Sequence, residues 1–483
     1  MKLKLLFALL IVTITNAQTQ IGQDIVGNID GEQFGYHVCI SADGTTIAGS
    51  TRPINGSYTA HVRIYKNISG VWTQIGNDFD IEAASGFAVS DVSLSADGSI
   101  VAIGQPTVFN NSMLGEGIVR IYENISGNWV QIGNDISGEA PNDESRIVSL
   151  SSDGSIVAIG GYFNSGNGLE AGYVRVYENI SGVWTQIGQD IDGEAAGDHS
   201  GKSVSLSANG NIVAIGAIGN GSLSGHVRVY ENISGVWTQI GQDIDGEAVL
   251  DYSGVSTSLS SDGSIVAIGA HHNDGNGSDS GHVRVYENIS GVWTQIGQDI
   301  DGEAAGDHSG QSVSLASNGN IVAIGAPIND NYFGHVRIYK NILGTWTQVG
   351  NDIDGKSING QCGWSVSLSA NGNSLVISAP FSINNSNNSN DGQIRVYDLS
   401  GILSSDTFVL ENFNIYPNPT TDILTIELKE NLTLEKVFVY DTAGKLVKET
   451  TEKTINVSAF AKGMYNVQVV TNQGKATKKV IVK

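Results

Sequence analysis

The sequence predicts an all-β protein: a seven-bladed β-propeller closed by an N-terminal strand, followed by a small Ig-like β-sandwich domain. Three observations lead to this prediction. A unit of about 55 residues recurs along most of the chain, each copy holds four strand-like runs, and the last copy lacks one run that the N-terminus carries. A fixed period of this size indicates stacked or radially arranged units, and four antiparallel strands per unit are typical of a propeller blade.

The repeat is marked by a tyrosine in a VRVY-type run, which recurs at Tyr65, Tyr122, Tyr177, Tyr230, Tyr286, Tyr339 and Tyr397. In the fourth copy we expect strands at 203–207, 212–216, 226–231 and 236–244, which are rich in Val, Ile, Tyr and Trp. Turns of Ala-Asn-Gly or Ser-Asp-Gly join the first two runs, and Asn-Ile-Ser-Gly joins the last two. The other two connections are long and differ between copies.

The two ends of the repeat predict that the ring closes. The seventh copy stops after its third run, at Tyr397, and residues 19–25 match the missing fourth run. We expect this N-terminal strand to complete the seventh blade, so that no edge strand is left bare. An open solenoid would need capping repeats with a polar outer face, and none is visible in the sequence. The propeller is therefore assigned to residues 18–399.

The repeat resembles a known family of propellers. The run FGYHVCISADGTTIAGS (34–50), followed by GHVRVYEN-type and GVWTQIG-type strands, is similar to the FG-GAP repeats of integrin-α-type propellers over about residues 18–400. The resemblance implies the fold and no particular function. Calcium-binding blades of that family carry an Asp-x-Asp-x-Asp-Gly loop between their first two strands. Here that turn is only Ala-Asp-Gly, at 42–44, so the resemblance does not imply that calcium site.

Residues 1–17 are predicted to be a secretory signal peptide. Lys2 and Lys4 form its charged region, residues 5–12 form an apolar run too short to span a bilayer, and Ala17 precedes the expected cleavage point. No other run approaches transmembrane length. The two cysteines, Cys39 and Cys362, fall in adjacent blades but are offset by ~16 Å along the strands at ~3.3 Å per residue, well beyond a Cα limit of ~7 Å for a disulfide. Two free thiols are expected.

The net charge of −24 is concentrated in the repeats. Residues 409–483 hold 10 Lys against 8 Asp and Glu, so the chain up to 408 without its signal peptide carries −28. Such a surface repels nucleic acid and anionic membranes. It suits cations, divalent metals or basic partners, or it serves solubility alone. No nucleic-acid partner is expected.

Residues 400–413 read as a linker, and 414–483 as alternating strands of a small sandwich. The second stretch resembles the type A sorting domain of the type IX secretion system of Bacteroidota. The resemblance rests on Tyr416, Pro417, Asn418 and Pro419, then Asp441 with Gly444 and Lys445, then Gly463 and Tyr465. It implies handling by the type IX secretion machinery, export across the outer membrane, and anchoring at the cell surface or release. The alternative is an ordinary Ig-like adhesive module.

A candidate ligand site emerges when the copies are aligned on the Val-Ser-Leu-type run of their first strand. The start of the innermost strand is then occupied by seven different residues: Tyr36, Ser90, Arg146, Lys202, Val255, Gln311 and Trp364. They should ring the channel mouth on the face of the long, variable loops, where binding usually occurs. An aromatic pair (Tyr36, Trp364) near cations (Arg146, Lys202) and Gln311 could seat a sugar or an acidic side chain. Alternatively, these residues simply face water.

Calcium is possible at acidic loops on the same face. Asp pairs end the fourth strand at Asp190/Asp192, Asp243/Asp245, Asp299/Asp301 and Asp352/Asp354, and an oxygen-rich loop contains Asp274, Asn276 and Asp279. Calcium needs six to eight oxygens, so each pair would need help, for example from Glu194, Glu247 or Glu303. The alternative is that Asp-Gly is a turn signal. His199, His271, His272 and His308 are expected to be solvated loop residues, because their spacing fits no zinc signature.

The sequence shows no nucleophile elbow, phosphate loop or metal-ligand motif, and its acidic residues come in repeat-wide sets. It therefore predicts no enzyme activity and no certain cofactor. The predicted function is that of a secreted or cell-surface binding or adhesion propeller, with glycans or surface proteins as possible partners. The alternatives are an extracellular hydrolase or lyase with a site at the channel, and a purely structural surface-layer protein.

Overall fold

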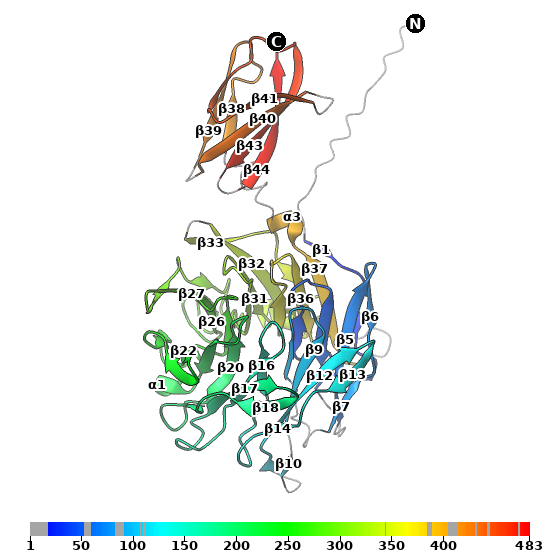
Figure 1. Cartoon of the computed structure of the whole chain (residues 1–483), viewed down its shortest axis with the longest axis vertical. Coiled ribbons are helices and arrows are strands. Elements are labelled where there is room, and N and C mark those ends of the chain that lie inside the picture. The colour runs from blue at the N-terminus through cyan, green and yellow to red at the C-terminus, as the bar shows by residue number, and fades with distance from the viewer. Residues whose placement is uncertain are drawn as a thin grey trace. The chain divides into compact units, whose positions relative to one another are not determined.

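The computed structural model describes residues 18–483 except 53–58, 83–90, 107, 110–112, 343, 384–388, 404–412, 430–431, 442–444 and 472–473. The chain divides into two compact units, Met1–Leu399 and Ser400–Lys483 (Figure 1). The predicted signal peptide (1–17) and most of the predicted linker (400–413) lie outside the described residues. Among those described, no helix has the length and apolar character needed to cross a membrane.

The first unit contains seven antiparallel sheets of five strands each among its described residues. The sheet of the fourth repeat shows the common plan: β20 (Ser200–Leu206), β21 (Ile212–Ala217), β22 (His226–Ile233) and β23 (Val236–Gln239) lie side by side, with β24 (Ile244–Asp245) also paired to β22. These strands coincide with the predicted runs to within a few residues. The prediction of an all-β protein is confirmed.

The fourth run of each repeat differs from the prediction of one continuous strand. It is broken into two short strands, β23 and β24, which both pair with β22. Gly241 lies in the break with a φ of +75°, which a strand residue cannot adopt. The side chain of Gln239 bridges the break by donating a hydrogen bond of 2.6 Å to the carboxylate of Asp243. The first Asp of the predicted pair thus has a structural role.

The sheets on the N-terminal side follow the same plan. The first consists of β3 (Val38–Ile40), β4 (Thr46–Ser50), β5 (Thr59–Ile68), β6 (Val71–Gln74) and β7 (Phe79–Glu82). The second consists of β8 (Asp91–Leu94), β9 (Ile100–Gln105), β12 (Ile118–Ile125), β13 (Asn128–Gln131) and β14 (Ile136–Ser137), with a small hairpin of β10 (Val108–Phe109) and β11 (Met113–Leu114). The third consists of β15 (Ile147–Leu150), β16 (Ile156–Gly161), β17 (Tyr173–Ile180), β18 (Val183–Gln186) and β19 (Ile191–Asp192).

The fifth and sixth sheets repeat it again. The fifth consists of β25 (Ser256–Leu259), β26 (Ile265–Ala270), β27 (His282–Ile289), β28 (Val292–Gln295) and β29 (Ile300–Asp301). The sixth consists of β30 (Ser312–Leu315), β31 (Ile321–Ala326), β32 (His335–Ile342), β33 (Thr345–Gln348) and β34 (Ile353–Asp354). The α1 (Asn220–Leu223) and α2 (Asn329–Tyr332) elements are four-residue turns within loops, and α3 (Ser400–Leu403) begins the second unit.

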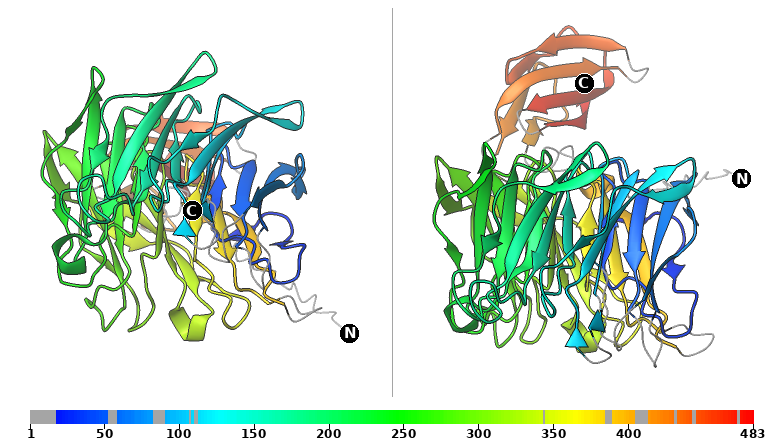
Figure 2. Two further views of the ribbon diagram at one scale, coloured as in Figure 1. Left: turned by 90° about the horizontal axis from the view of Figure 1, so that it is seen from below. Right: turned by 60° about the horizontal axis from the view of Figure 1, so that its bottom comes forward.

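The seventh sheet joins the two ends of the first unit. It contains β35 (Val366–Leu368), β36 (Ser374–Ala379) and β37 (Gln393–Asp398), and β37 pairs with β1 (Thr19–Gln20) and β2 (Ile25–Val26). This is the pairing that the sequence predicts for residues 19–25. The first strands of successive sheets contact one another in a closed cycle, β3, β8, β15, β20, β25, β30, β35 and back to β3. The sheets therefore surround one axis in a propeller-like arrangement (Figure 2).

The hydrophobic core lies between neighbouring sheets rather than within one. Buried Val, Ile and Ala side chains of adjacent sheets form one cluster at each described interface, such as Val229, Ile244, Val266 and Ile268 between the fourth and fifth sheets. A strand tryptophan closes six of the interfaces between sheets: the indole of Trp237, for example, is 3% exposed and donates to the carbonyl of Ile187 in the preceding sheet at 2.8 Å. The six strand tryptophans all make this contact, which agrees with a packing role.

The second unit is a pair of antiparallel sheets around its own core. One sheet contains β38 (Phe413–Tyr416), β39 (Ile423–Leu428) and β42 (Thr454–Asn456). The other contains β41 (Leu446–Thr450), β40 (Leu434–Tyr440), β43 (Gly463–Thr471) and β44 (Gly474–Val482). Their inner faces share one buried cluster that includes Phe413, Val437 and Val467.

Candidate functional site

The residues predicted at the channel mouth line one cavity of about 430 Å³. Tyr36, Arg146, Lys202, Gln311 and Trp364 all contribute to its wall, together with Val255. The seventh aligned position, Ser90, lies outside the described residues. The opposite end of the channel is lined by an apolar side chain from each sheet, the Ile or Leu that ends each first strand. Variation in the repeat is therefore gathered at one end of the channel.

An Asp-x-Ser-Gly loop precedes three of the mouth residues, Lys202, Val255 and Gln311. In the sixth repeat, Asp307 accepts the backbone N–H of Ala304 at 2.9 Å, and His308 and Gly310 adopt left-handed φ values of +56° and +89°. The N–H of Gln311 then bonds the carbonyl of His308 at 3.2 Å. The tight turn directs the next residue toward the channel. The local sequence therefore sets the position of the mouth residue that follows each of these loops.

One side of the mouth is aromatic. The rings of Tyr36 and Trp364, from the first and seventh sheets, have centroids 5.1 Å apart. Phe381 packs edge-on against Trp364 at 5.6 Å, and the guanidinium of Arg52 lies 5.6 Å from the centre of the Tyr36 ring. Such a group offers flat apolar faces with a cation beside them, which suits the ring of a sugar as well as an acidic group.

Another part of the mouth, on the third and fourth repeats, is cationic. Arg146 forms an ion pair of 3.2 Å with Glu144 and donates a hydrogen bond of 3.0 Å to the hydroxyl of Tyr162. The ammonium of Lys202 lies 4.7 Å from the centre of the Tyr162 ring. Burial, and then the positive charge of Arg146, lower the pKa of Lys202 to about 8. Among the residues that the structure describes, no carboxylate lies within ion-pair distance of Lys202.

A histidine and an aspartate also line the wall of this cavity. His37 Nδ1 lies 3.3 Å from a carboxylate oxygen of Asp91, and the other oxygen of Asp91 accepts the N–H of Val148 at 2.9 Å. Burial is the main cause that lowers the pKa of His37, which favours a neutral imidazole. Arg146 is paired to Glu144 and Asp91 is engaged in the protein, whereas Lys202 has no ion pair with a described carboxylate and is available to meet a ligand.

The acidic residues predicted as weak calcium ligands have other partners in the structure. The first Asp of each pair, Asp190, Asp243, Asp299 or Asp352, accepts a hydrogen bond from the Gln four residues earlier at 2.5–2.6 Å. The second Asp, such as Asp245, ends a short strand. Burial and then the neighbouring Asp raise the pKa of Asp192 and of Asp301. The placement supports the turn interpretation of these pairs.

The oxygen-rich loop is also engaged internally. Asp274 accepts the backbone N–H of Asp279 at 2.8 Å, and the amide of Asn276 donates to the carbonyl of Gly302 at 2.9 Å. The carboxylate of Asp279 contacts His272 Nδ1 at 2.6 Å. Within the described part of the chain, no group of three His, Cys, Asp or Glu ligands includes Asp274 or Asp279.

Three equivalent Glu-His-Asp groups lie where neighbouring sheets meet: Glu194/His226/Asp243, Glu247/His282/Asp299 and Glu303/His335/Asp352. Each has an arginine beside it. The guanidinium of Arg228 lies 3.7 Å from Glu194 and donates to the backbone carbonyl of Asp192 at 2.8 Å. Because this cation already compensates the carboxylate, we interpret the groups as structural links between sheets.

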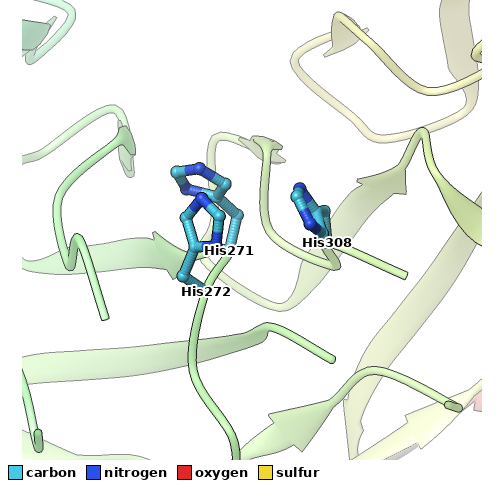
Figure 3. Close-up of side chains that lie close together, drawn as sticks. All are labelled: His271, His272 and His308. Carbon is cyan, nitrogen blue, oxygen red and sulfur yellow. The ribbon is translucent and has the colours of Figure 1, made fainter. Parts of the chain in front are cut away.

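A different cluster escaped the sequence analysis. His271 and His272 follow β26, His308 precedes β30 of the next sheet, and Figure 3 shows their three rings lying close together. Potential ligand nitrogens of all three lie within 4.8 Å of one another. The expectation of separate solvated loop histidines did not anticipate this grouping. The signal was present in the repeat, because the residue after the second strand of each sheet and the variable residue of Asp-x-Ser-Gly differ from copy to copy, as the mouth residues do.

The residues that carry the sorting-domain resemblance lie in the second unit. Tyr416 ends β38 and is 47% exposed, and the peptide bonds before Pro417 and Pro419 are cis. The side chain of Asn418 binds the last strand through the carbonyl of Lys479 and the N–H of Ile481, both at 3.0 Å. Gly463 begins β43, and the Tyr465 hydroxyl donates to the carbonyl of Ala461 at 2.8 Å.

Comparison with known families identifies the second unit. Residues 414–483 match the family described as the secretion system C-terminal sorting domain, which confirms the predicted type IX sorting domain. The chain is therefore secreted and reaches the outer cell surface. One curated relative, ulvan lyase NLR42 of Nonlabens ulvanivorans, is 40% identical over 81 residues. The match covers 16% of this chain and only 15% of that protein.

Solved structures similar to the chain have related folds at low identity. Hydrazine synthase of Kuenenia stuttgartiensis aligns with a TM-score of 0.48 and 13% identity, covering 77% of this chain and 97% of that one. The WD40 repeats of RRP9 align with a TM-score of 0.48 and 13% identity, covering 79% of this chain and 99% of that one. The periplasmic gluconolactonase PpgL of Pseudomonas aeruginosa aligns with a TM-score of 0.47 and 16% identity, covering 66% of this chain and 85% of that one.

Proposed function

We propose that this outer-surface protein is a binding module that takes an anionic glycan at the channel mouth. The observation that carries the proposal is the cavity itself, which joins the Tyr36/Trp364 pair to the cations Arg146 and Lys202. Flat aromatic faces suit sugar rings, and the ammonium and guanidinium groups suit carboxylates or sulfates. Gln311, on the same wall, offers amide donors and an acceptor for sugar hydroxyls.

The finer features of the fold belong to the same proposal. We take the seven sheets to be the blades of one closed seven-bladed propeller of FG-GAP type, and the second unit to be an Ig-like sandwich. The closed pairing of β1 and β2 with β37 supports the first assignment, and the two facing sheets of the second unit support the other. After export, the sorting domain is removed and the propeller acts in adhesion or recognition at the cell surface.

The test uses the chain without its signal peptide and a matched pair of ligands. Polygalacturonate and its methyl-esterified form share their sugar rings but differ in charge. We expect the charged polymer to bind and the ester to bind at least about tenfold more weakly, since charge-assisted contacts contribute about 1.5–3 kcal/mol. Trp364→Ala should weaken binding by about 2 kcal/mol, or roughly 30-fold.

Val255→Ala is the control for that variant, because Val255 lines the same cavity without a ring or a charge. It should bind as the unchanged protein does. Equal affinity for the ester and the charged polymer, or full binding by Trp364→Ala, would contradict the proposed site.

A second candidate function is a lyase at the same mouth, and one specific observation favours it. Lys202, with its pKa lowered to about 8, could take a proton from the carbon next to a uronate carboxylate while Arg146 compensates that carboxylate. The electron pair forms a C=C bond, the glycosidic C–O bond breaks, and an acid must protonate the leaving oxygen. The short match to an ulvan lyase agrees with this class of reaction.

The two functions are separated by incubating the protein with ulvan and with polygalacturonate. The unsaturated product of a lyase absorbs ultraviolet light, so a steady rise in absorbance that Lys202→Met abolishes would establish the enzyme. A binding module should give no rise while still retaining the polymer.

A further inference from the structure

Two loops from neighbouring sheets place three histidine rings side by side. His271 and His272 directly follow β26, whereas His308 lies in the loop before β30. Their ring centroids are separated by 4.2 Å for His271 and His272, 4.7 Å for His272 and His308, and 5.6 Å for His271 and His308. Figure 3 shows the first two rings on one loop and the third beside them on the next. Three imidazoles this close cannot all carry a proton without strong repulsion.

Burial and the neighbouring rings act on the pKa of two of these histidines. Burial, and then the neighbouring His272 and His308, lower the pKa of His271 to about 3. Burial and then His272 also lower the pKa of His308. Neutral imidazole has a free nitrogen lone pair, which is the form that coordinates a metal ion.

One ring nitrogen of the cluster is left without a partner. Nδ1 of His271 is buried and makes no hydrogen bond within the described part of the protein. Buried polar atoms are normally satisfied, and each exception calls for a physical reason. A bound cation between the rings would supply the missing partner.

A carboxylate contacts one of the three imidazole rings. Asp279 Oδ1 lies 2.6 Å from Nδ1 of His272, and this contact is the main cause that lowers the pKa of Asp279. With Nδ1 engaged, Nε2 is the nitrogen of His272 that remains for coordination. A carboxylate behind a metal-binding histidine is a recurrent arrangement, because it fixes the tautomer and the orientation of the ring.

We propose that His271, His272 and His308 bind one divalent transition-metal ion, with zinc as the best fit. Three imidazoles and one open position match the ligand set of zinc sites that bind a further molecule. Hard cations such as calcium and magnesium prefer oxygen ligands and are not expected here. Zn–N bonds of about 2.0–2.1 Å require the rings to draw together on binding. This site is separate from the glycan proposal and stands without it.

The chain contains a matched control for this site. His199 occupies the same Asp-His-Ser-Gly sequence as His308, with φ of +55° against +56°. Its ring packs on Phe163 at a centroid distance of 5.3 Å, and its Nε2 faces Glu170 at 3.3 Å. No second histidine joins it among the described residues. His199→Ala therefore removes an equivalent loop histidine without touching the cluster.

The experiment titrates zinc into untagged protein that lacks the signal peptide and has been stripped with EDTA. Isothermal calorimetry should show one tight site, and Co²⁺ should give the visible absorption of a nitrogen-ligated ion. His271→Ala and His308→Ala should lose this site, and His199→Ala should keep it. Asp279→Asn should weaken it by about 10–100-fold, as expected for a residue that acts through His272.

Several outcomes would overturn the proposal. They are the absence of a zinc site in the unchanged protein, a site that survives both His271→Ala and His308→Ala, and a loss in His199→Ala equal to that in His308→Ala. If the zinc site is lost in His226→Ala instead, the metal binds at the Glu-His-Asp groups and not at the histidine cluster. Thermal melts in EDTA, where no metal is bound, show whether each variant is folded, so that a folding defect is not mistaken for a lost ligand.

Discussion

Lys202 is the mouth residue whose charge changes closest to neutral pH. Because burial and Arg146 lower its pKa to about 8, the side chain is charged below that pH and neutral above it. An anionic ligand favours the charged form. We therefore expect affinity for polygalacturonate to be full below pH 8 and to fall as the pH rises through about 8, measured as Kd over a pH series.

Two substitutions distinguish this residue from other titrating groups. Lys202→Arg stays charged at all these pH values, so its affinity should not fall through pH 8. Lys202→Met should bind weakly at every pH. A decline that persists unchanged in Lys202→Arg would assign the pH dependence to another group.

At the scale of the strand, a ring of hydroxyls links the innermost strands around the channel. The N–H of Leu315 bonds the hydroxyl of Ser258 in the preceding sheet at 2.9 Å, and five other junctions repeat this contact. At the seventh junction, Cys39 takes the place of the serine and receives the N–H of Leu94. The hydroxyls satisfy backbone groups that an inner edge strand would otherwise leave unpaired.

The ring of hydroxyls predicts that two similar substitutions change the free energy of unfolding by different amounts. Ser258→Ala leaves the N–H of Leu315 without an acceptor, which should lower the free energy of unfolding by about 1–3 kcal/mol. Cys39→Ser restores the hydroxyl of the other copies and should change it by less than about 1 kcal/mol. Denaturant melts of both variants test the idea, and equal losses would show that the hydroxyl acceptor is unimportant.

At the scale of the whole molecule, the N-terminal strands close the ring. β1 and β2 pair with β37, and Ile21 supplies the carbonyl that accepts the indole N–H of Trp72 at 2.8 Å. The same junction holds Arg63, fully buried, with two of its three guanidinium nitrogens each 2.8 Å from a carboxylate oxygen of Glu32. The ends of the repeat are therefore tied by backbone pairing, a tryptophan hydrogen bond and an ion pair.

Removal of residues 18–26 should open this junction. It leaves β37 with an unpaired edge and exposes part of the apolar surface around Trp72, so we expect a lower melting temperature and a tendency to aggregate. A chain that ends at Leu399 is the control, because it removes the second unit with its separate core but keeps β1 and β2. If the N-terminal truncation melts as the control does, closure does not stabilise the ring.

Much of the site was within reach of sequence reasoning, and the part that was not has a clear cause. The mouth residues could be aligned because each precedes the same VSL-type strand, so one register places all of them. The break in the fourth strand was missed, since the left-handed Gly241 lies inside a run with strong strand composition. The Asp pairs were considered as cation ligands, whereas their first members accept hydrogen bonds from Gln side chains.

The sequence by itself determined the repeat, the strands, the tight turns, the pairing of the two ends and the sorting domain, because these depend on local periodicity, turn chemistry and a contiguous motif. Only the tertiary structure decided which side chains meet. His271 and His308 belong to different repeats, and Tyr36 and Trp364 come from opposite ends of the unit. Their contacts depend on how far each sheet rotates about the common axis and on how the long loops pack, and neither property has a local signature in the chain.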